Sequence, residues 1–272
     1  MGSRRVTVLD HHHREGGRPQ GLPEGPLAAR DGVELHARGG ALACVGATGR
    51  RRWQRPCPGR PNAAHLSADR VLVTTDSAEC TVRGGRLAPA LLLDLADGRT
   101  VAELRGERGA ALDDGLFALG RKGDGAFGTV TLDRDGTPVD AWHSYGHYVV
   151  GAGLRVVETD RREPTGNRVV RLLPGGRIER GPLLADPQAP PPLVLADGTL
   201  LVLDAGVLRA VGPDLDDAVL AELLPLAPER RARFTGSLHR AGDRLAVTLV
   251  ERHPVRMGRY TTHAWTLDLH AP

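Results

Sequence analysis

The stretch that decides the fold is Leu193-Val-Leu-Ala-Asp-Gly-Thr-Leu-Leu-Val-Leu-Asp204, which sets two apolar runs on either side of an Asp-Gly turn. This pattern is the local chemistry of an antiparallel β-hairpin. Similar phrases recur at 27–35, 66–73, 111–119, 149–157 and 238–249. Their spacing is roughly 38 to 46 residues, and a period of that size indicates a β-propeller or a solenoid.

A second hairpin follows most of these phrases, at 41–53, 91–104, 130–142, 169–179 and 207–220. Four strands per unit is the composition of one propeller blade. The sixth unit, from about Phe234 through Arg244–Glu251 to Tyr260–Leu269, is one strand short, and Arg4–Asp10 can supply that strand. The sequence therefore predicts an all-β fold: one domain over 1–272, a six-bladed β-propeller of four-stranded antiparallel blades, with the last blade closed by the N-terminal strand.

The composition fits this fold and bounds the setting. Hydrophobic residues make up 40% of the 272, but aromatics only 3%, so the core must rest on Val, Leu and Ala. The 35 Gly and 20 Pro residues interrupt the chain too often for long helices. With no apolar run long enough for a membrane span and no signal-peptide pattern, we expect a cytoplasmic protein without membrane contact. Three cysteines, an odd number, argue against a disulfide framework.

The charge balance argues against nucleic acid as a partner. The net charge is +3, and Lys122 is the only lysine, so nearly all of the positive charge is arginine. A nucleic-acid binder would more often combine clustered cations with stacking aromatics, and the chain has only three Phe, three Trp and three Tyr. Arginine forks also suit carboxylates and phosphates, which leaves an anionic small molecule as a candidate ligand.

Two local stretches resemble known propeller families. Gly46-Ala-Thr-Gly-Arg-Arg-Arg-Trp53 resembles the Thr-Gly…Trp end of a PQQ-like repeat, within a pattern that is also WD40-like. Leu22-Pro-Glu-Gly-Pro-Leu27, followed by Arg30-Asp-Gly-Val33, is similar to the Glu-Gly-Pro entry of the six-bladed gluconolactonase/SMP-30 family. That resemblance implies Glu24 as a metal ligand. No repeat carries a PQQ-binding set, so no organic cofactor is expected.

The connections of the predicted blades fall into two kinds. One edge carries tight turns with little chemical content, and the other carries long irregular segments, where function usually resides. Histidines gather in or beside the long segments, and His65, His143 and His147, with Tyr145, are our candidates for acid–base catalysis. The alternative is that irregular loops simply tolerate polar residues. The run His11-His-His13 is interpreted as a solvated loop.

The candidate anion-binding residues are Arg108, Arg233 and Arg252, which belong to the arginines expected on the long-loop face.

A register argument gives the candidate metal site. Counting eight positions back from the turn of each inner hairpin gives six residues that should rim one mouth of the channel: Glu24, Asn62, Glu107, Tyr145, Pro190 and Thr235. Glu24, Asn62 and Glu107 offer the oxygen ligands that a divalent cation such as calcium, magnesium or manganese prefers. Tyr145 and Pro190 stand where the gluconolactonase family places Asn and Asp. The alternative is a set of solvated polar residues at a channel mouth.

Two functions follow from this sequence. The first is a small-metabolite enzyme of lyase, cyclase or hydrolase type that works without an organic cofactor at the long-loop face. The alternative is a non-catalytic propeller that binds a peptide or a partner protein on the same face. Binding propellers usually carry an aromatic or apolar rim, whereas this rim is rich in His, Arg and Gly, which favours the enzyme. The fold by itself cannot decide.

Overall fold

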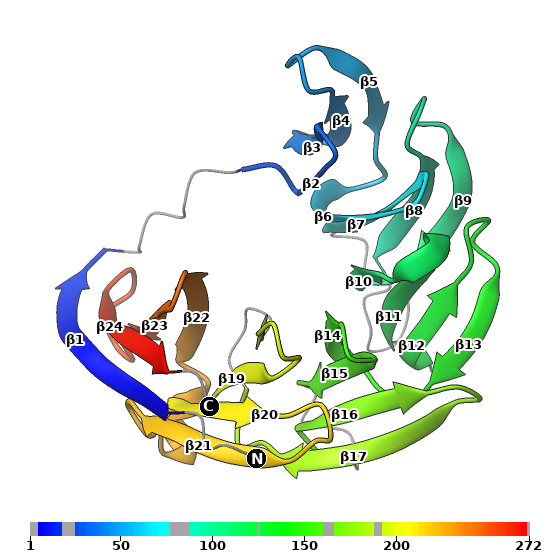
Figure 1. Ribbon diagram of the computed structural model, residues 1–272. Coiled ribbons are helices and arrows are strands. Elements are labelled where there is room, and N and C mark those ends of the chain that lie inside the picture. The colour runs from blue at the N-terminus through cyan, green and yellow to red at the C-terminus, as the bar shows by residue number, and fades with distance from the viewer. Residues whose placement is uncertain are drawn as a thin grey trace. The chain divides into compact units, whose positions relative to one another are not determined.

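The computed structural model describes residues 5–17, 25–76, 88–123, 126–159, 166–187 and 192–270. Almost all regular structure is β, and the strands form six four-stranded antiparallel sheets, each a blade (Figure 1). The all-β prediction of a six-bladed β-propeller is therefore confirmed. No helix in the described part of the chain is long or apolar enough to cross a membrane.

The first three blades follow one another in the sequence. Blade 1 is β2 (Ala28–Arg30), β3 (Val33–Arg38), β4 (Ala41–Val45) and β5 (Arg51–Pro56). Blade 2 is β6 (Arg60–Ser67), β7 (Arg70–Asp76), β8 (Pro89–Asp94) and β9 (Thr100–Arg105). Blade 3 is β10 (Arg108–Ala111), β11 (Phe117–Gly123), β12 (Ala126–Leu132) and β13 (Pro138–Trp142), with the short 3-10 helix η1 (Asp113–Gly115) between its first two strands.

The other three blades complete the chain. Blade 4 is β14 (Gly146–Val150), β15 (Leu154–Glu158), β16 (Arg168–Leu173) and β17 (Arg177–Leu183). Blade 5 is β18 (Leu193–Val194), β19 (Leu200–Asp204), β20 (Val207–Val211) and β21 (Asp217–Glu222). The short helix α1 (Pro228–Arg231) leads to blade 6, which is β22 (Phe234–Ala241), β23 (Arg244–Arg252), β24 (Tyr260–His270) and β1 (Arg5–Gly16).

The chain divides into two compact units. Unit 1 comprises Met1–Leu22, Gly151–Arg171 and Arg180–Pro272, and unit 2 comprises Pro23–Val150 and Leu172–Glu179. Unit 2 thus contains blades 1 to 3 and the first strand of blade 4, and unit 1 contains blades 5 and 6.

The inner hairpins form because of their turn residues. At the first, Asp31 (φ 51°) and Gly32 (φ 72°) both adopt the left-handed conformation that joins two twisted strands tightly. Some of the strands that leave these turns are buried along most of their length: in β7 every residue but the last is buried, and in β19 every residue is. The core therefore rests largely on aliphatic side chains, as expected for a chain with few aromatic residues.

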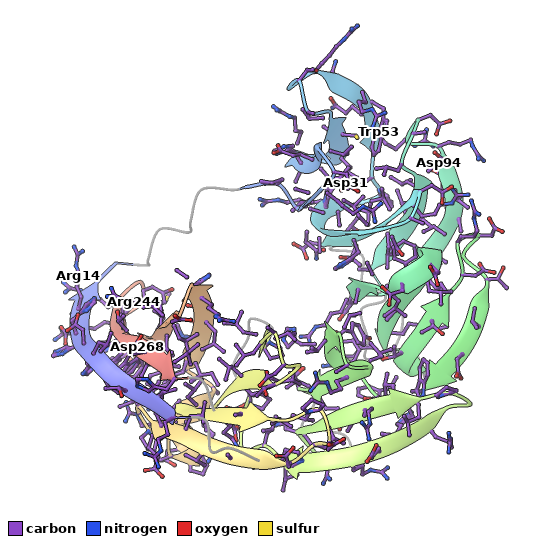
Figure 2. The ribbon with its side chains drawn as sticks, viewed as in Figure 1. Arg14, Asp31, Trp53, Asp94, Arg244 and Asp268 are labelled. Carbon is purple, nitrogen blue, oxygen red and sulfur yellow. The ribbon has the colours of Figure 1, made fainter. Side chains whose placement is uncertain are left out.

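The few tryptophans link neighbouring blades of unit 2. The indole Nε1 of Trp53 on β5 donates to the carbonyl of Leu95 in blade 2 at 2.9 Å (Trp53 is labelled in Figure 2). Trp142 on β13 donates in the same way to the carbonyl of Leu173 in blade 4 at 2.7 Å. Both indole rings are buried, so each contributes apolar area together with a satisfied hydrogen bond.

The N-terminal strand closes blade 6, as predicted, but it is longer than expected. β1 pairs with β24 along its whole length, from Arg5 opposite His270 to Gly16 opposite Tyr260 (Figure 1). The interpretation of residues 11–13 as a loop is therefore wrong. They lie in β1 because the eleven-residue β24 offers a free edge for all of them. The ring of His11 stacks on that of Trp265, with centroids 4.6 Å apart.

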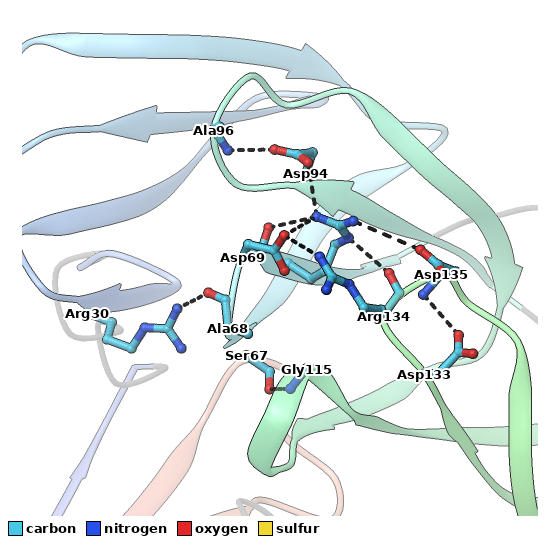
Figure 3. Close-up of polar contacts among 11 residues, drawn as sticks. Arg30, Ser67, Ala68, Asp69, Asp94, Ala96, Gly115, Asp133, Arg134 and Asp135 are labelled. Carbon is cyan, nitrogen blue, oxygen red and sulfur yellow. Dashed lines mark hydrogen bonds and ion pairs between the residues drawn. The ribbon is translucent and has the colours of Figure 1, made fainter.

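The tight turns of unit 2 carry more chemistry than the sequence indicated. Arg70, at the start of β7 and only 7% exposed, donates from Nη1 to Asp94 Oδ2 at 3.0 Å and from Nε to the carbonyl of Arg134 at 2.9 Å (Figure 3). Asp69 accepts from both Arg70 and Arg134 at 2.8 Å. Because Arg134 belongs to blade 3, this buried cation joins blades 2 and 3. The expectation of turns with little chemical content is wrong here.

Among the described residues, Cys44 is buried, Cys57 is half-buried, and both are free thiols. Burial raises the pKa of the Cys44 thiol, although the nearby Arg52 opposes the shift. Burial also raises the pKa of the Cys57 thiol, so neither thiol is suited to act as a nucleophile near neutral pH.

Candidate functional site

The first four inner strands bring the predicted site residues of unit 2 to one edge. Contacts join β2 to β6, β6 to β10 and β10 to β14. We call the edge at which these four strands begin, and at which β3, β7 and β11 end, the strand-start edge. Of the six residues given by the register argument, Asn62, Glu107 and Tyr145 lie there. Glu24 and Pro190 lie outside the described residues, and Thr235 belongs to unit 1.

Glu107 and Tyr145, from blades 3 and 4, meet at this edge. The Tyr145 hydroxyl donates to Glu107 Oε2 at 2.8 Å. Burial raises the pKa of Tyr145, whose side chain is nearly inaccessible, and the neighbouring Arg108 partly opposes that shift. The phenol is therefore a neutral donor that holds the carboxylate. The Arg108 guanidinium lies 5.1 Å from the centre of the Tyr145 ring, and the Lys122 ammonium lies 5.7 Å from it.

His147 lies beside this group on β14. Burial, with a smaller contribution from the positive charge of Arg108, lowers the pKa of His147 to about 4. The imidazole is therefore neutral at pH 7. Its Nε2 atom is buried and has no hydrogen-bond partner among the described residues. An orphaned buried nitrogen of this kind is either strain held by the fold or a position for a ligand or a water.

The neighbouring Tyr148 is committed to packing. The Thr129 hydroxyl donates to the carbonyl of Ser144 at 2.6 Å, so the Tyr148 hydroxyl, 2.9 Å away, donates to Thr129. Both tyrosines pack over Gly120, where a Cβ would lie 3.2 Å from the Tyr145 ring and still closer to the Tyr148 hydroxyl. Only glycine fits at this position.

His65 and His143, the other two predicted catalytic histidines, lie in different surroundings. The His65 ring on β6 packs on Gly109 of β10, where a Cβ would approach the ring to 2.6 Å. Burial lowers the pKa of His65 to about 4, and its Nε2 has no partner among the described residues. His143 is exposed, with its ring 5.2 Å from that of Phe127. Phe127 also contacts Tyr145, at 5.6 Å, so His143 and Tyr145 share one aromatic neighbour.

Two of the predicted anion-binding arginines belong to unit 1. Arg233 Nη2 lies 3.9 Å from Glu251 Oε1, and Arg230 Nη2 lies 3.1 Å from Glu251 Oε2. The guanidinium of Arg233 is thus paired within its own blade. The backbone N–H of Arg252 donates to the carbonyl of Arg233 at 2.9 Å, which fixes the chain but not the exposed Arg252 side chain.

The described part of the predicted metal site already has partners. Asn62 Oδ1 accepts from the buried Thr74 hydroxyl at 2.7 Å, and Asn62 Nδ2 donates to Asp76 Oδ1 at 2.6 Å. Glu107 holds Tyr145. Within the described ranges, no three His, Cys, Asp or Glu side chains are grouped so that they could hold a metal ion. Because Glu24 lies outside these ranges, the divalent cation stays a prediction, as does the resemblance to the gluconolactonase family that implied it.

A cavity of about 650 Å³ lies at the strand-start edge between blades 1 and 2. Its size is within the range of small-molecule sites. Residues from just before β2, from the end of β3, from the start of β6 and from the end of β7 line it: Gly25, Leu27, His36, Ala37, Arg38, Arg60, Pro61, Asn62 and Asp76.

A β-bulge shapes the floor of this cavity. The pairing of β6 with β7 shifts register between Pro61 and Ala63, so Asn62 is the extra residue. Bulges re-aim side chains and are common beside functional sites. Pro61 was a readable signal, because proline inside a sheet is confined to edges and bulges. No sequence motif marked Arg38 or Asp76. They are the last residues of β3 and β7, the second strands of blades 1 and 2.

A second hollow of about 660 Å³ lies at the tight-turn edge of blade 1 and is more open to solvent. Asp31, Arg50, Arg51 and Arg52 are among its lining residues, and all four side chains are exposed. We interpret these arginines as a solvated charged face, and they supply control positions for the experiments below.

Comparisons with known proteins support the fold alone. No protein-family model and no curated protein sequence matches the chain. Among solved structures it is similar to Citrobacter koseri AztD (TM-score 0.52, 11% identity, 88% of this chain and 72% of that chain). It is also similar to BBS1N in complex with ARL6DN (0.50, 13%, 92% and 79%) and to BamB from Moraxella catarrhalis (0.44, 16%, 85% and 81%).

Proposed function

We propose that the protein binds a small carboxylate-bearing molecule in the cavity between blades 1 and 2, with Arg38 as its anchor. The observation that carries this proposal is the state of Arg38. Its exposed side chain lines a cavity of about 650 Å³, and within the described ranges its guanidinium makes no hydrogen bond or ion pair. A guanidinium fork matches a carboxylate in two parallel hydrogen bonds.

The rest of the lining supports an anionic group at one end of the ligand. Arg60 adds a second positive charge at the start of β6, and His36 presents an imidazole whose Nε2 is 2.9 Å from Glu34. Leu27, Pro61 and Ala37 provide apolar walls.

Binding without turnover is the function that the described geometry supports best. None of the four predicted catalytic side chains (His65, His143, Tyr145, His147) is among the described residues that line the cavity. A lyase, cyclase or hydrolase activity is the second candidate, and one observation favours it. His147 Nε2 is buried without a described partner beside the Arg108 charge, and a neutral imidazole there offers a hydrogen bond that could orient a bound substrate.

The test compares two arginines. Calorimetric titration with butyrate and hexanoate, as monocarboxylate probes, should give binding in the wild type that falls about tenfold or more in Arg38→Gln. The control Arg52→Gln, in the open hollow at the other edge, should bind like the wild type. Equal affinity in Arg38→Gln and wild type would rule out Arg38 as the anchor. Incubated probes that are recovered unchanged by NMR would support binding over catalysis, and a product lost in His147→Gln would support the enzyme.

A further inference from the structure

The cavity proposed to bind the ligand is also lined by one carboxylate of the protein, that of Asp76. Asp76 is the last residue of β7 and lines the same cavity as Arg38, which is the last residue of β3. Its side chain is exposed to the cavity and makes one hydrogen bond within the described ranges, accepted by Oδ1 from Asn62. The second carboxylate oxygen, Oδ2, is free to accept from a ligand.

Two hydrogen bonds, from Thr74 to Asn62 and from Asn62 to Asp76, fix the orientation of this carboxylate. Thr74, two residues earlier on β7, is fully buried, and its hydroxyl donates to Asn62 Oδ1 at 2.7 Å. That bond turns the Asn62 amide nitrogen towards Asp76, to which it donates at 2.6 Å. The bulge at Asn62 makes this relay of three side chains geometrically possible. A relay that starts from a buried hydroxyl holds the carboxylate without neutralising its charge.

We propose that the ligand is a small zwitterion of amino-acid type, with its carboxylate on Arg38 and its ammonium group on Asp76. This inference rests on the proposed function and adds the second half of the ligand. A cation and an anion that line one cavity recognise opposite charges at the two ends of one molecule. Without an ammonium group in the ligand, the carboxylate of Asp76 would face the ligand's own negative charge at a cost.

The experiment uses pairs of probes with and without a charged ammonium group. The probes are the ω-amino acids from glycine to 6-aminohexanoate and their N-acetylated counterparts, each titrated calorimetrically into the full chain. The series is needed because it varies the distance between the two charges, and a cavity of about 650 Å³ has room for every member. At least one free amino acid should bind about tenfold or more tightly than its acetylated form, since acetylation removes a charge-assisted hydrogen bond.

The variants then assign that difference to Asp76. In Asp76→Asn, which keeps the shape of the side chain, the free and acetylated probes should bind equally. Asp31→Asn, in the hollow at the other edge, should preserve the difference.

Equal binding of free and acetylated probes to the wild type, or a difference that persists in Asp76→Asn, would overturn the zwitterion while leaving the proposed function in place. Failure of every probe, acetylated and free, to depend on Arg38 would overturn both.

Discussion

Acidification should destabilise the protein through His65, and the size of the effect follows from its burial. The pKa of His65 falls from its ordinary 6.5 to about 4 because the ring is enclosed between β6 and Gly109 of β10. In the unfolded chain the imidazole is protonated below its ordinary pKa, whereas in the folded protein it stays neutral until about pH 4. The unfolded state therefore binds the extra proton, and stability is lost as pH falls from 6.5 to 4.

The magnitude can be worked out from the same two values. One proton of difference changes the free energy of unfolding by about 1.4 kcal/mol per pH unit within that interval. Between pH 7.5 and pH 4.5, His65 should then cost the wild type about 2 to 3 kcal/mol. The variant His65→Leu cannot take up the proton, so its stability should fall by that much less over the same range.

Urea unfolding of both proteins at pH 7.5, 6.5, 5.5 and 4.5 measures this difference directly. Carboxylates elsewhere in the chain titrate equally in both proteins, and any packing change due to leucine is independent of pH, so both drop out of the comparison. His147→Leu should flatten the curve in the same direction, because burial and Arg108 also lower the pKa of His147 to about 4. Parallel curves for wild type and His65→Leu would refute the argument that burial keeps this imidazole neutral.

Three further predictions concern the fold. Arg70→Ala should lower the free energy of unfolding by about 3 kcal/mol in urea melts, because it removes a buried guanidinium that joins blades 2 and 3 and leaves the half-buried Asp94 carboxylate without its cation. Arg134→Ala, on the exposed side of the same cluster, should cost less than about 1 kcal/mol. Equal costs would contradict the role of Arg70 as the link between these two blades. Gly98→Ala should melt well below Gly39→Ala: both have positive φ, but only at Gly98 would a Cβ meet an indole ring, at 2.7 Å. Deleting residues 1–16 should expose the edge of β24 and cause aggregation, and a truncated protein that stays monomeric and melts like the full chain would contradict closure by β1.

The fold was predictable because its signals are local. Each inner hairpin is indicated by turn residues between apolar runs. Asp31 and Gly32, for example, adopt the left-handed conformation that Asp and Gly favour in tight turns. Repetition of that unit then gives the number of blades. The length of β1 was not predictable in this way. Its second half includes three consecutive histidines, and this polar run predicts a loop. The three residues form a strand because they pair with the long strand β24.

The candidate site was predictable in part. Register placed Glu107 and Tyr145 at equivalent positions, and in the structure they share a hydrogen bond of 2.8 Å. Register could not say that Tyr145 and His147 would be largely enclosed by the neighbouring blade, because burial depends on how closely two sheets pack. The cavity between blades 1 and 2 was missed for the same reason. A space left between blades is a property of two strands distant in sequence, and neither Arg38 nor Asp76 is unusual in its own segment.

In a chain whose positive charge is almost all arginine, position in a long loop does not identify an anion site, and contacts do. Arg155 is fully buried and donates to the carbonyls of Gly198 and Gly212, and Arg209 is paired with Asp204 and Asp217. Such guanidiniums already donate to carbonyls and carboxylates of the fold, and an anion could reach those donors only by breaking bonds that hold the blades. Arg38 lines a cavity with its donors uncommitted to any described residue. Its charge is free to be neutralised by a ligand, and that difference is why we propose Arg38 as the anchor.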